Sequence, residues 1–243
     1  MCGRFRLARK KEILEEEFDA EWVAEDDGAE WVPRFNVAPG QEIAVVRQDA
    51  ARRQLSQMRW GLIPSWTNDP SLGHKLSYKM INARSETAAA MPAFREPLRL
   101  RRCLIPADGF YEWKRAGKEK LPFCFTLADG SLFALAGVWD RWKNSQGRWI
   151  ESCSILTTTP NELARDLHDR MPVILARDRY ELWLDPGFRN VAELQPLLKP
   201  YPAEAMRRYQ VSQRVNQVQN DDAECAAEFD ATALDRAGEN LLF

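Results

Sequence analysis

The sequence of 243 residues contains few of the residues from which metal sites and disulfide networks are built. It has only two histidines, His74 and His168, and its five cysteines include no Cys-x-x-Cys pair. A zinc site of the usual spacing is therefore not expected, and nothing indicates another metal or a cofactor. Because the number of cysteines is odd and they are widely spaced, we expect reduced thiols and a cytoplasmic protein.

Long hydrophobic runs are also missing. No stretch reaches the roughly 18 apolar residues that a membrane-spanning helix needs. Charged residues, among them Lys10, Lys11 and the glutamates at 15–17, interrupt the segment where a signal peptide would have its apolar region. The length suits one large domain or two small ones, and the absence of internal repeats and low-complexity linkers favours a single domain.

The net charge is only −2, but it is unevenly distributed. Residues 219–243 contain seven acidic residues and one arginine, which gives −6, so residues 1–218, with 33 basic and 29 acidic residues, carry +4. A basic main part permits an anionic partner without proving one. We expect a single domain over residues 2–218, followed by an acidic tail over residues 219–243 that is peripheral or mobile.

The secondary-structure pattern is mixed, and the strands follow one another in hairpin-like succession. Strands are predicted over residues 42–47, 54–63, 103–105, 109–114, 123–127, 132–139, 149–157 and 206–211. Helices are predicted over residues 11–18, from Ser85 with an interruption near Pro92, from Asn161 toward His168, and over 177–183 and 191–198, with His74 in a loop. Because helices and strands do not alternate regularly, we expect an α+β fold with a largely antiparallel, barrel-like sheet flanked by short helices.

The position of Cys2 is the first chemical signal. A side chain as small as cysteine permits removal of the initiator methionine, so the mature chain would begin with Cys2. Its α-amine and thiol would then lie on adjacent carbon atoms, a pair of nucleophiles that no internal cysteine offers. The alternative is a residue without function on a frayed terminus.

A second polar segment contains Asn82 and Arg84 just before the helix predicted from Ser85. An arginine beside the N–H groups of a helix N-terminus can bind a phosphate or a carboxylate. Alternatively, Ser85 caps the helix and Arg84 is only solvated.

Two further segments carry groups that can transfer protons. Glu112 lies between Tyr111 and Trp113 on a predicted strand, so it shares a face with Phe110, and such a carboxyl group has the raised pKa of a general acid if it is buried. His168 lies at the predicted end of a helix, where functional side chains often occur. The alternatives are an outward-facing glutamate and a structural histidine.

Taken together, the motifs resemble the SOS response-associated peptidase (SRAP) family, abasic-site-processing proteins that crosslink to damaged single-stranded DNA. The resemblance runs in family order from residue 2 to about residue 215, and its motifs are Met1-Cys2-Gly3-Arg4-Phe5, Asn36-Val37-Ala38-Pro39, Trp60-Gly61-Leu62-Ile63-Pro64 with Trp66, Asn82-Ala83-Arg84-Ser85-Glu86-Thr87, Arg102-Cys103-Leu104-Ile105-Pro106 through Gly109-Phe110-Tyr111-Glu112-Trp113, and His168-Asp169-Arg170-Met171-Pro172.

The resemblance implies a role for each site residue. Glu112 would be the general acid/base in sugar ring opening and imine formation, His168 would move protons at the same centre, and Asn82 would orient the amine or thiol of Cys2. The DNA-binding residues would be Arg4, Arg84 and Arg170 on phosphates, Trp60 and Trp66 on bases, and Pro39. Core packing is the alternative for each tryptophan.

The implied reaction explains the position of Cys2. The α-amine condenses with the ring-opened aldehyde of an abasic site, and the thiol then adds to the imine to form a thiazolidine. The resemblance also implies single-stranded DNA as the partner, a monomer, and association with the nucleoid during damage. Two alternatives remain: a thiol peptidase with an N-terminal nucleophile, and a non-catalytic module that binds single strands or modified bases.

Overall fold

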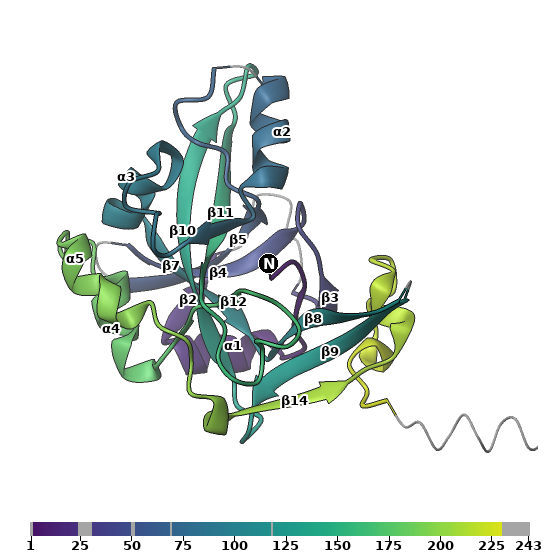
Figure 1. The fold of residues 1–243 in the computed structure, drawn as a ribbon. Helices are drawn as coiled ribbons and strands as arrows, with labels where there is room; N and C mark the ends of the chain where they lie inside the picture. Colours follow the sequence, from purple (N-terminus) through teal and green to yellow (C-terminus); the bar gives the residue numbers. More distant parts are fainter. Residues whose placement is uncertain (1, 24–30, 50–51, 69, 118, 230–243) are drawn as a thin grey trace, which may run out of the picture.

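The computed structural model describes residues 2–23, 31–49, 52–68, 70–117 and 119–229. Its centre is a closed barrel of five strands (Figure 1). The barrel strands are β4 (Glu42–Asp49), β5 (Arg52–Trp60), β7 (Arg102–Ala107), β10 (Phe133–Lys143) and β11 (Trp149–Thr158). Neighbouring strands are antiparallel except at the closure, where β11 pairs in parallel with β5 through Ser152 and Arg59 and through Cys153 and Trp60.

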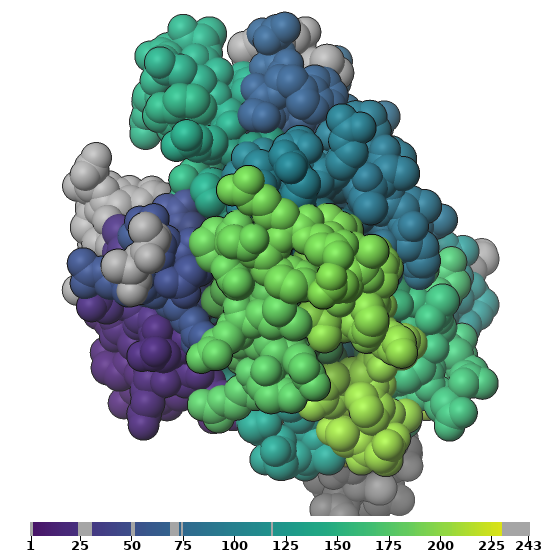
Figure 2. Space-filling model, turned by 90° about the vertical axis from the view of Figure 1, so that its left-hand side faces the viewer, coloured from purple at the N-terminus to yellow at the C-terminus, as the bar shows by residue number. Residues whose placement is uncertain are grey.

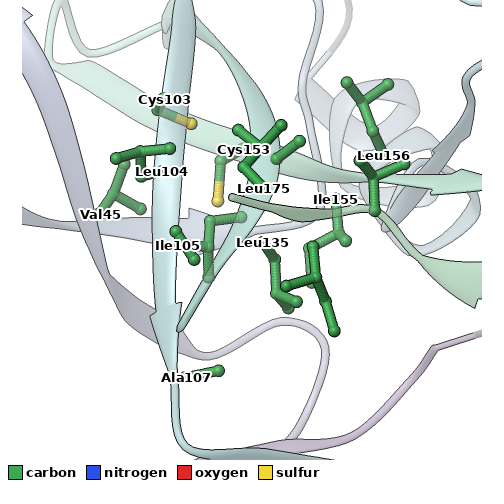
Figure 3. Close-up of a cluster of buried hydrophobic side chains, with 14 of the residues drawn as sticks. Val45, Cys103, Leu104, Ile105, Ala107, Leu135, Cys153, Ile155, Leu156 and Leu175 are labelled. Carbon is green, nitrogen blue, oxygen red and sulfur yellow. The ribbon is translucent and has the colours of Figure 1, made fainter. Parts of the chain in front are cut away.

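Apolar side chains of the barrel strands form a buried cluster (Figure 3). Cys103 and Ile105 of β7 lie opposite Gly137 and Leu135 of β10, and these side chains are fully buried. A Cβ atom at Gly137 would lie only 2.8 Å from the Cys103 Sγ, so the packing requires glycine there. The barrel strands are buried on both faces, since β7 is buried along its whole length and β10 is buried from Phe133 to Val138.

A second sheet holds the beginning of the chain. Its order is β14 (Met206–Gln210), β9 (Glu119–Leu127), β8 (Gly109–Ala116), β1 (Phe5–Leu7) and β3 (Arg34–Val37), and every pairing is antiparallel. The chain passes from the barrel into this sheet at Asp108, between β7 and β8.

Asp108 attaches β1 to β8. Its buried carboxylate lies 3.0 Å from the Arg6 Nε and accepts a hydrogen bond of 2.9 Å from the Ala8 N–H. A Cβ atom at the next residue, Gly109, would lie 2.8 Å from the same Arg6 Nε. The N-terminal strand is therefore fixed in position three residues after Cys2.

The remaining elements are short. The strands are β2 (Ala20–Trp22), β6 (Asn82–Arg84), β12 (Met171–Pro172) and β13 (Ile174–Leu175). The α-helices are α1 (Lys11–Phe18), α2 (Pro70–Lys79), α3 (Pro92–Leu100), α4 (Tyr180–Leu184) and α5 (Val191–Leu194). The 3₁₀ helices are η1 (Arg177–Arg179), η2 (Gln195–Leu197), η3 (Ala203–Ala205), η4 (Gln213–Asn216) and η5 (Ala223–Cys225). In Figure 2 the green surface of the segment that contains α4 and α5 lies between the purple surface of α1 and the blue surface of α3.

The structure confirms the α+β fold with a largely antiparallel barrel, the helix over residues 11–18 and the eight main strands. Three local predictions are wrong. Turns follow Ser85, and the helix begins only at Pro92, because proline suits the first turn of a helix, where no N–H partner is needed. His74 lies in α2 and not in a loop.

The third difference concerns Asn161. It accepts a hydrogen bond from the Ala164 N–H, as a cap would, but the residues up to His168 form turns instead of a helix.

The boundary expected after residue 218 does not coincide with a break in the chain's packing. Asp221 accepts hydrogen bonds from the N–H groups of Phe35 and Asn36 and pairs with Arg34. Asp221 therefore attaches the beginning of the expected tail to β3, and the part of the tail from residue 230 onward lies outside the described residues. Within the described part of the chain, no helix is long and apolar enough to cross a membrane.

Candidate active site

The antiparallel pairing of β1 with β8 determines what lies beside the N-terminal residues. Phe5 is opposite Phe110, and the Tyr111 N–H donates a hydrogen bond of 2.9 Å to the Arg4 carbonyl. Continued by one residue, this register places Gly3 opposite Glu112. The strand pairing thus brings the segment that contains Cys2 to the predicted general acid/base.

Asn82 reaches the same segment from another part of the barrel. It begins β6, which pairs in parallel with β11, so that Asn82 lies opposite Ile155. Its Nδ2 donates a hydrogen bond of 2.8 Å to the carbonyl oxygen of Cys2, which is fully buried. The Asn82 Oδ1 is also buried and has no hydrogen-bond partner among the described residues, so it is an acceptor available to a group that enters the site.

The environment of Glu112 suits proton transfer near neutral pH. Its side chain is only 4% exposed, and burial raises its pKa to about 7; the negative charge of Asp169 acts in the same direction. A carboxyl group with this pKa exists in both protonation states at pH 7. It can therefore donate and accept a proton in successive steps.

His168 lies in the loop between β11 and β12. Its Nδ1 accepts a hydrogen bond of 3.0 Å from the Arg170 N–H and lies 2.8 Å from an Asp169 carboxylate oxygen. The first contact requires an unprotonated Nδ1, whereas the second favours a charged ring. Burial lowers the pKa of His168, so we assign the neutral ring with its proton on Nε2.

Glu112 and His168 line one groove, with a volume of about 450 Å³, together with Arg4. The other lining residues are Trp113, Arg115, Lys120 and Asn216. The sequence analysis did not identify Arg115, Lys120 or Asn216 as site residues. The available signal was the basic run from residue 114 to residue 120, because its β8–β9 register places Arg115 opposite Lys120.

Arg4 is anchored by the C-terminal part of the fold. Its Nη1 donates hydrogen bonds of 2.7 Å to the Asn36 Oδ1 and to the Val215 carbonyl, and its guanidinium lies over the Trp113 ring at 5.6 Å. Burial lowers the pKa of Arg4. The fully buried Asn36 also donates to the Val215 carbonyl, at 3.2 Å, so the asparagine of the second motif helps to position Arg4.

The other two predicted phosphate-binding arginines differ from each other. Arg84 is exposed at the end of β6. Arg170 is buried, and its two Nη atoms bind both carboxylate oxygens of Glu86 at 2.8 Å, while Nη2 also donates to the Thr157 carbonyl. A phosphate could therefore bind Arg170 through its Nη groups only by displacing Glu86, and in this structure the side chain links the turn after β6, β11 and the loop that carries His168.

The three other residues that we expected to bind DNA, Trp60, Trp66 and Pro39, differ in their exposure to solvent. Trp60 is fully buried, donates from Nε1 to the Ile81 carbonyl at 2.9 Å and packs edge-on against Phe5, so its predicted base contact is wrong and the core-packing alternative holds. Trp66 is 54% exposed. Pro39 is half-buried in the turn between β3 and β4. Among the described residues, no group of three or more His, Cys, Asp or Glu side chains could hold a metal ion.

The structure thus combines an α+β barrel, a buried Cys2 whose carbonyl accepts a hydrogen bond from Asn82, and a groove lined by Glu112 and His168. Residues 1–218 match the family described as "SOS response associated peptidase (SRAP)", and the chain belongs to this family.

Relatives with established names agree with this assignment. The chain is 46% identical to "Abasic site processing protein YoaM" of Bacillus subtilis, over 92% of this chain and 96% of that protein. It is 32% identical to "Abasic site processing protein HMCES" of Xenopus tropicalis, over 83% of this chain and 68% of that protein. A crystal structure of a protein from Bacteroides thetaiotaomicron superimposes with a TM-score of 0.86 at 27% identity, over 94% of this chain and all of that one.

Proposed function

We propose that this protein recognises abasic sites in DNA and processes them enzymatically, by forming a covalent link between the lesion and Cys2. Membership of the SRAP family and the names of its relatives support abasic sites as the substrate. The covalent chemistry rests on the residues that surround Cys2.

The observation that carries the proposal is the arrangement of three separate segments around the one that contains Cys2. Asn82 from β6 donates to its carbonyl at 2.8 Å, the β1–β8 register places Glu112 beside it, and His168 shares a groove with Glu112. Residues that lie 80 to 166 positions from Cys2 in the sequence are thus assembled around the N-terminus.

The reaction requires that Met1 be removed, because the nitrogen of Cys2 otherwise belongs to a peptide bond. The free α-amine then attacks the aldehyde carbon of the ring-opened abasic sugar, and loss of one water molecule gives an imine. Because the departing water takes its proton from an acid, the imine is left protonated; the thiol then adds to the imine carbon, its own proton passes to a base, and a five-membered thiazolidine closes. Since an α-amine has a pKa of about 8, a useful fraction is neutral and nucleophilic at pH 7. The second attack is intramolecular, which favours ring closure by several orders of magnitude.

The pKa values of Cys2 and Glu112 support the following roles in the proton transfers. Burial raises the pKa of the Cys2 thiol well above its usual range, so the thiol reaches the imine in its protonated form and needs a base. Glu112, with its pKa of about 7, accepts that proton after it has donated one to the departing water. The Nε2–H of His168 donates a hydrogen bond to the sugar oxygen that is released on ring opening. The Oδ1 of Asn82 orients the amine.

The DNA strand is held by cations around the groove. Arg4, Arg115 and Lys120 line it, and Arg84 is exposed at the end of the strand that carries Asn82. We infer a preference for single-stranded DNA, because Cys2 is recessed and the stacked pairs of a duplex would prevent the sugar from reaching it. The chain would act as a monomer.

The geometry does not favour a peptidase acting through Asn82. A peptidase needs a hydrogen-bond donor at the carbonyl of the bond that it cleaves, whereas Asn82 donates to the carbonyl of Cys2 itself. That carbonyl is not part of the Met1–Cys2 peptide bond.

The test is a denaturing gel of the purified protein mixed with single-stranded DNA that contains one abasic site. The mature chain should give an adduct that survives heating in detergent. Cys2→Ala keeps an α-amine where Met1 is removed, so its adduct should appear only after borohydride trapping. A version with an uncleaved N-terminal extension should form no stable adduct, and Cys225→Ser serves as the control because this cysteine lies outside the groove.

Each alternative function predicts a different experimental result. Equal crosslinking by the extended chain, shown by mass measurement to be uncleaved, would exclude the amine mechanism. Turnover of peptides without DNA would support a peptidase, and binding without any adduct would support a passive module.

A further inference from the structure

We propose that the β10–β11 hairpin is a second DNA-binding element, which holds the strand that flanks the lesion; this inference rests on the proposed function. β7 accompanies β10 only as far as the pair Arg102–Val138, whereas β10 and β11 stay paired up to Lys143 and Trp149. The hairpin therefore extends beyond the edge of β7, beside α2 (Figure 1), and its tip is the teal lobe at the top of Figure 2.

The tip of the hairpin is basic and carries an exposed indole. Residues 141–150 include Arg141, Lys143 and Arg148 but no acidic residue, and none of the three cations forms an ion pair with a described residue. Trp149 is 58% exposed. The Arg141 guanidinium lies over its ring at 5.1 Å and the Lys143 Nζ at 5.6 Å, so cations and the aromatic ring are held together.

The alternation of β10 separates this face from the packed one. Arg141 and Lys143 are both exposed on one face, and Trp149 lies opposite Lys143. The intervening Trp142 is buried and donates from Nε1 to the Thr67 carbonyl at 2.6 Å. The packed face thus anchors the hairpin and leaves the basic face open to a ligand.

The carboxylates nearest to the tip of the hairpin are each paired with an arginine, so their charge is compensated and does not repel a phosphate. Asp140 is buried on the packed face, and Arg101 lies 3.2 Å from its carboxylate. Glu151 pairs with Arg47 at 2.6 Å. A hollow of about 440 Å³ lies beside β10, and Arg101, Arg141 and Trp149 are among its lining residues.

This combination fits nucleic acid, because phosphates bind the cations and a base stacks on the indole. The site geometry also sets the length of DNA that is needed. Asn82, which contacts Cys2, lies opposite Ile155, and Trp149 is six residues along β11, or about 20 Å at 3.3 Å per residue. At the spacing of stacked nucleotides, ~3.4 Å, this distance corresponds to about six nucleotides.

The experiment compares two abasic single strands. One has two nucleotides on each side of the lesion, which reach about 7 Å and cannot contact the hairpin, and the other has ten. Equilibrium binding is measured in the Cys2→Ala background, which cannot close the thiazolidine, for Trp149→Ala, for Trp149→Phe and for the double variant Arg141→Ala/Lys143→Ala. The control is Arg189→Ala/Lys199→Ala, which removes the same charge from exposed positions near α5.

Trp149→Ala should weaken binding of the long strand by about five- to 150-fold and leave the short strand unchanged, while Trp149→Phe keeps most of the affinity. The double variant should lower the slope of log affinity against log salt by about 1.4 for the long strand only. Unchanged binding of the long strand, or equal losses for both strands, would overturn the proposal. A wild-type protein that forms no adduct with either strand would instead refute the proposed function.

Discussion

Replacing Glu112 by glutamine should slow adduct formation. It should also make the variant more stable relative to wild type as the pH rises, because the same buried carboxyl group affects the rate and the stability. Burial raises its pKa from an ordinary value of 4.5 to about 7. In the folded protein it therefore holds a proton between these two values, where the unfolded chain has lost it. Wild-type stability should fall as the pH rises from 4.5 to 7 and then become constant with respect to this group.

The size of the effect follows from the pKa. At 1.36 kcal/mol per pH unit, the full penalty on the folded state is ~3 kcal/mol, of which about 2–3 kcal/mol develops between pH 5 and pH 8. Glutamine has a similar shape and is neutral at every pH. Urea denaturation at both pH values should therefore show the free energy of unfolding of Glu112→Gln gaining this amount relative to wild type.

Although Glu112→Gln should be more stable than wild type at higher pH, it should form the adduct more slowly. Loss of a general acid/base typically costs ~10² to 10⁴ in rate, and the limb of the pH–rate profile near pH 7 should disappear. Glu119→Gln, an exposed position on the same β8–β9 hairpin, should change neither property. A Glu112→Gln variant that crosslinks at the wild-type rate, or whose relative stability does not depend on pH, would refute this account of the carboxyl group.

Further predictions concern DNA binding. Arg84→Ala should lower the slope of log affinity against log salt by about 0.7, whereas Arg170→Ala should leave that slope unchanged and lower stability by ~1–3 kcal/mol, because it breaks the contacts with Glu86 and Thr157. Salt titrations and urea denaturation measure the two effects, and an exchange of phenotypes would contradict the roles assigned here. Abasic single strands should crosslink faster than abasic duplexes, since Cys2 is fully buried; equal rates on a gel time course would count against the recessed site.

The parts of the fold that were predictable depend on local patterns. The strands were found because short apolar runs such as the one around Cys103 and Ile105 are typical of strands, and β7 is indeed buried along its whole length. The segment after Ser85 could not be predicted in this way. The N–H of Ser85 itself donates a hydrogen bond to the Thr157 carbonyl and so extends the pairing of β6 with β11. This long-range contact overrides the local helix signal.

The same distinction applies to the site. Glu112 was singled out because aromatic neighbours on a strand predict burial, and it is indeed buried. The pairing of Arg170 with Glu86 was not predicted, because the two residues lie 84 positions apart and the spacing of a motif carries no information about such a pair. The link from Arg4 to Val215 is of the same kind.

That link spans 211 residues and bears on how the protein is made. Cys2 is among the first residues to leave the ribosome, but the groove around it is complete only when η4 has emerged and Val215 has reached Arg4. At the usual rate of synthesis this takes roughly 10 to 40 s. During that time the nascent chain carries Cys2 without the groove that Glu112, His168 and Arg4 line in the folded protein. The residue to which we assign the reaction is thus made first, and the groove beside its strand is completed last.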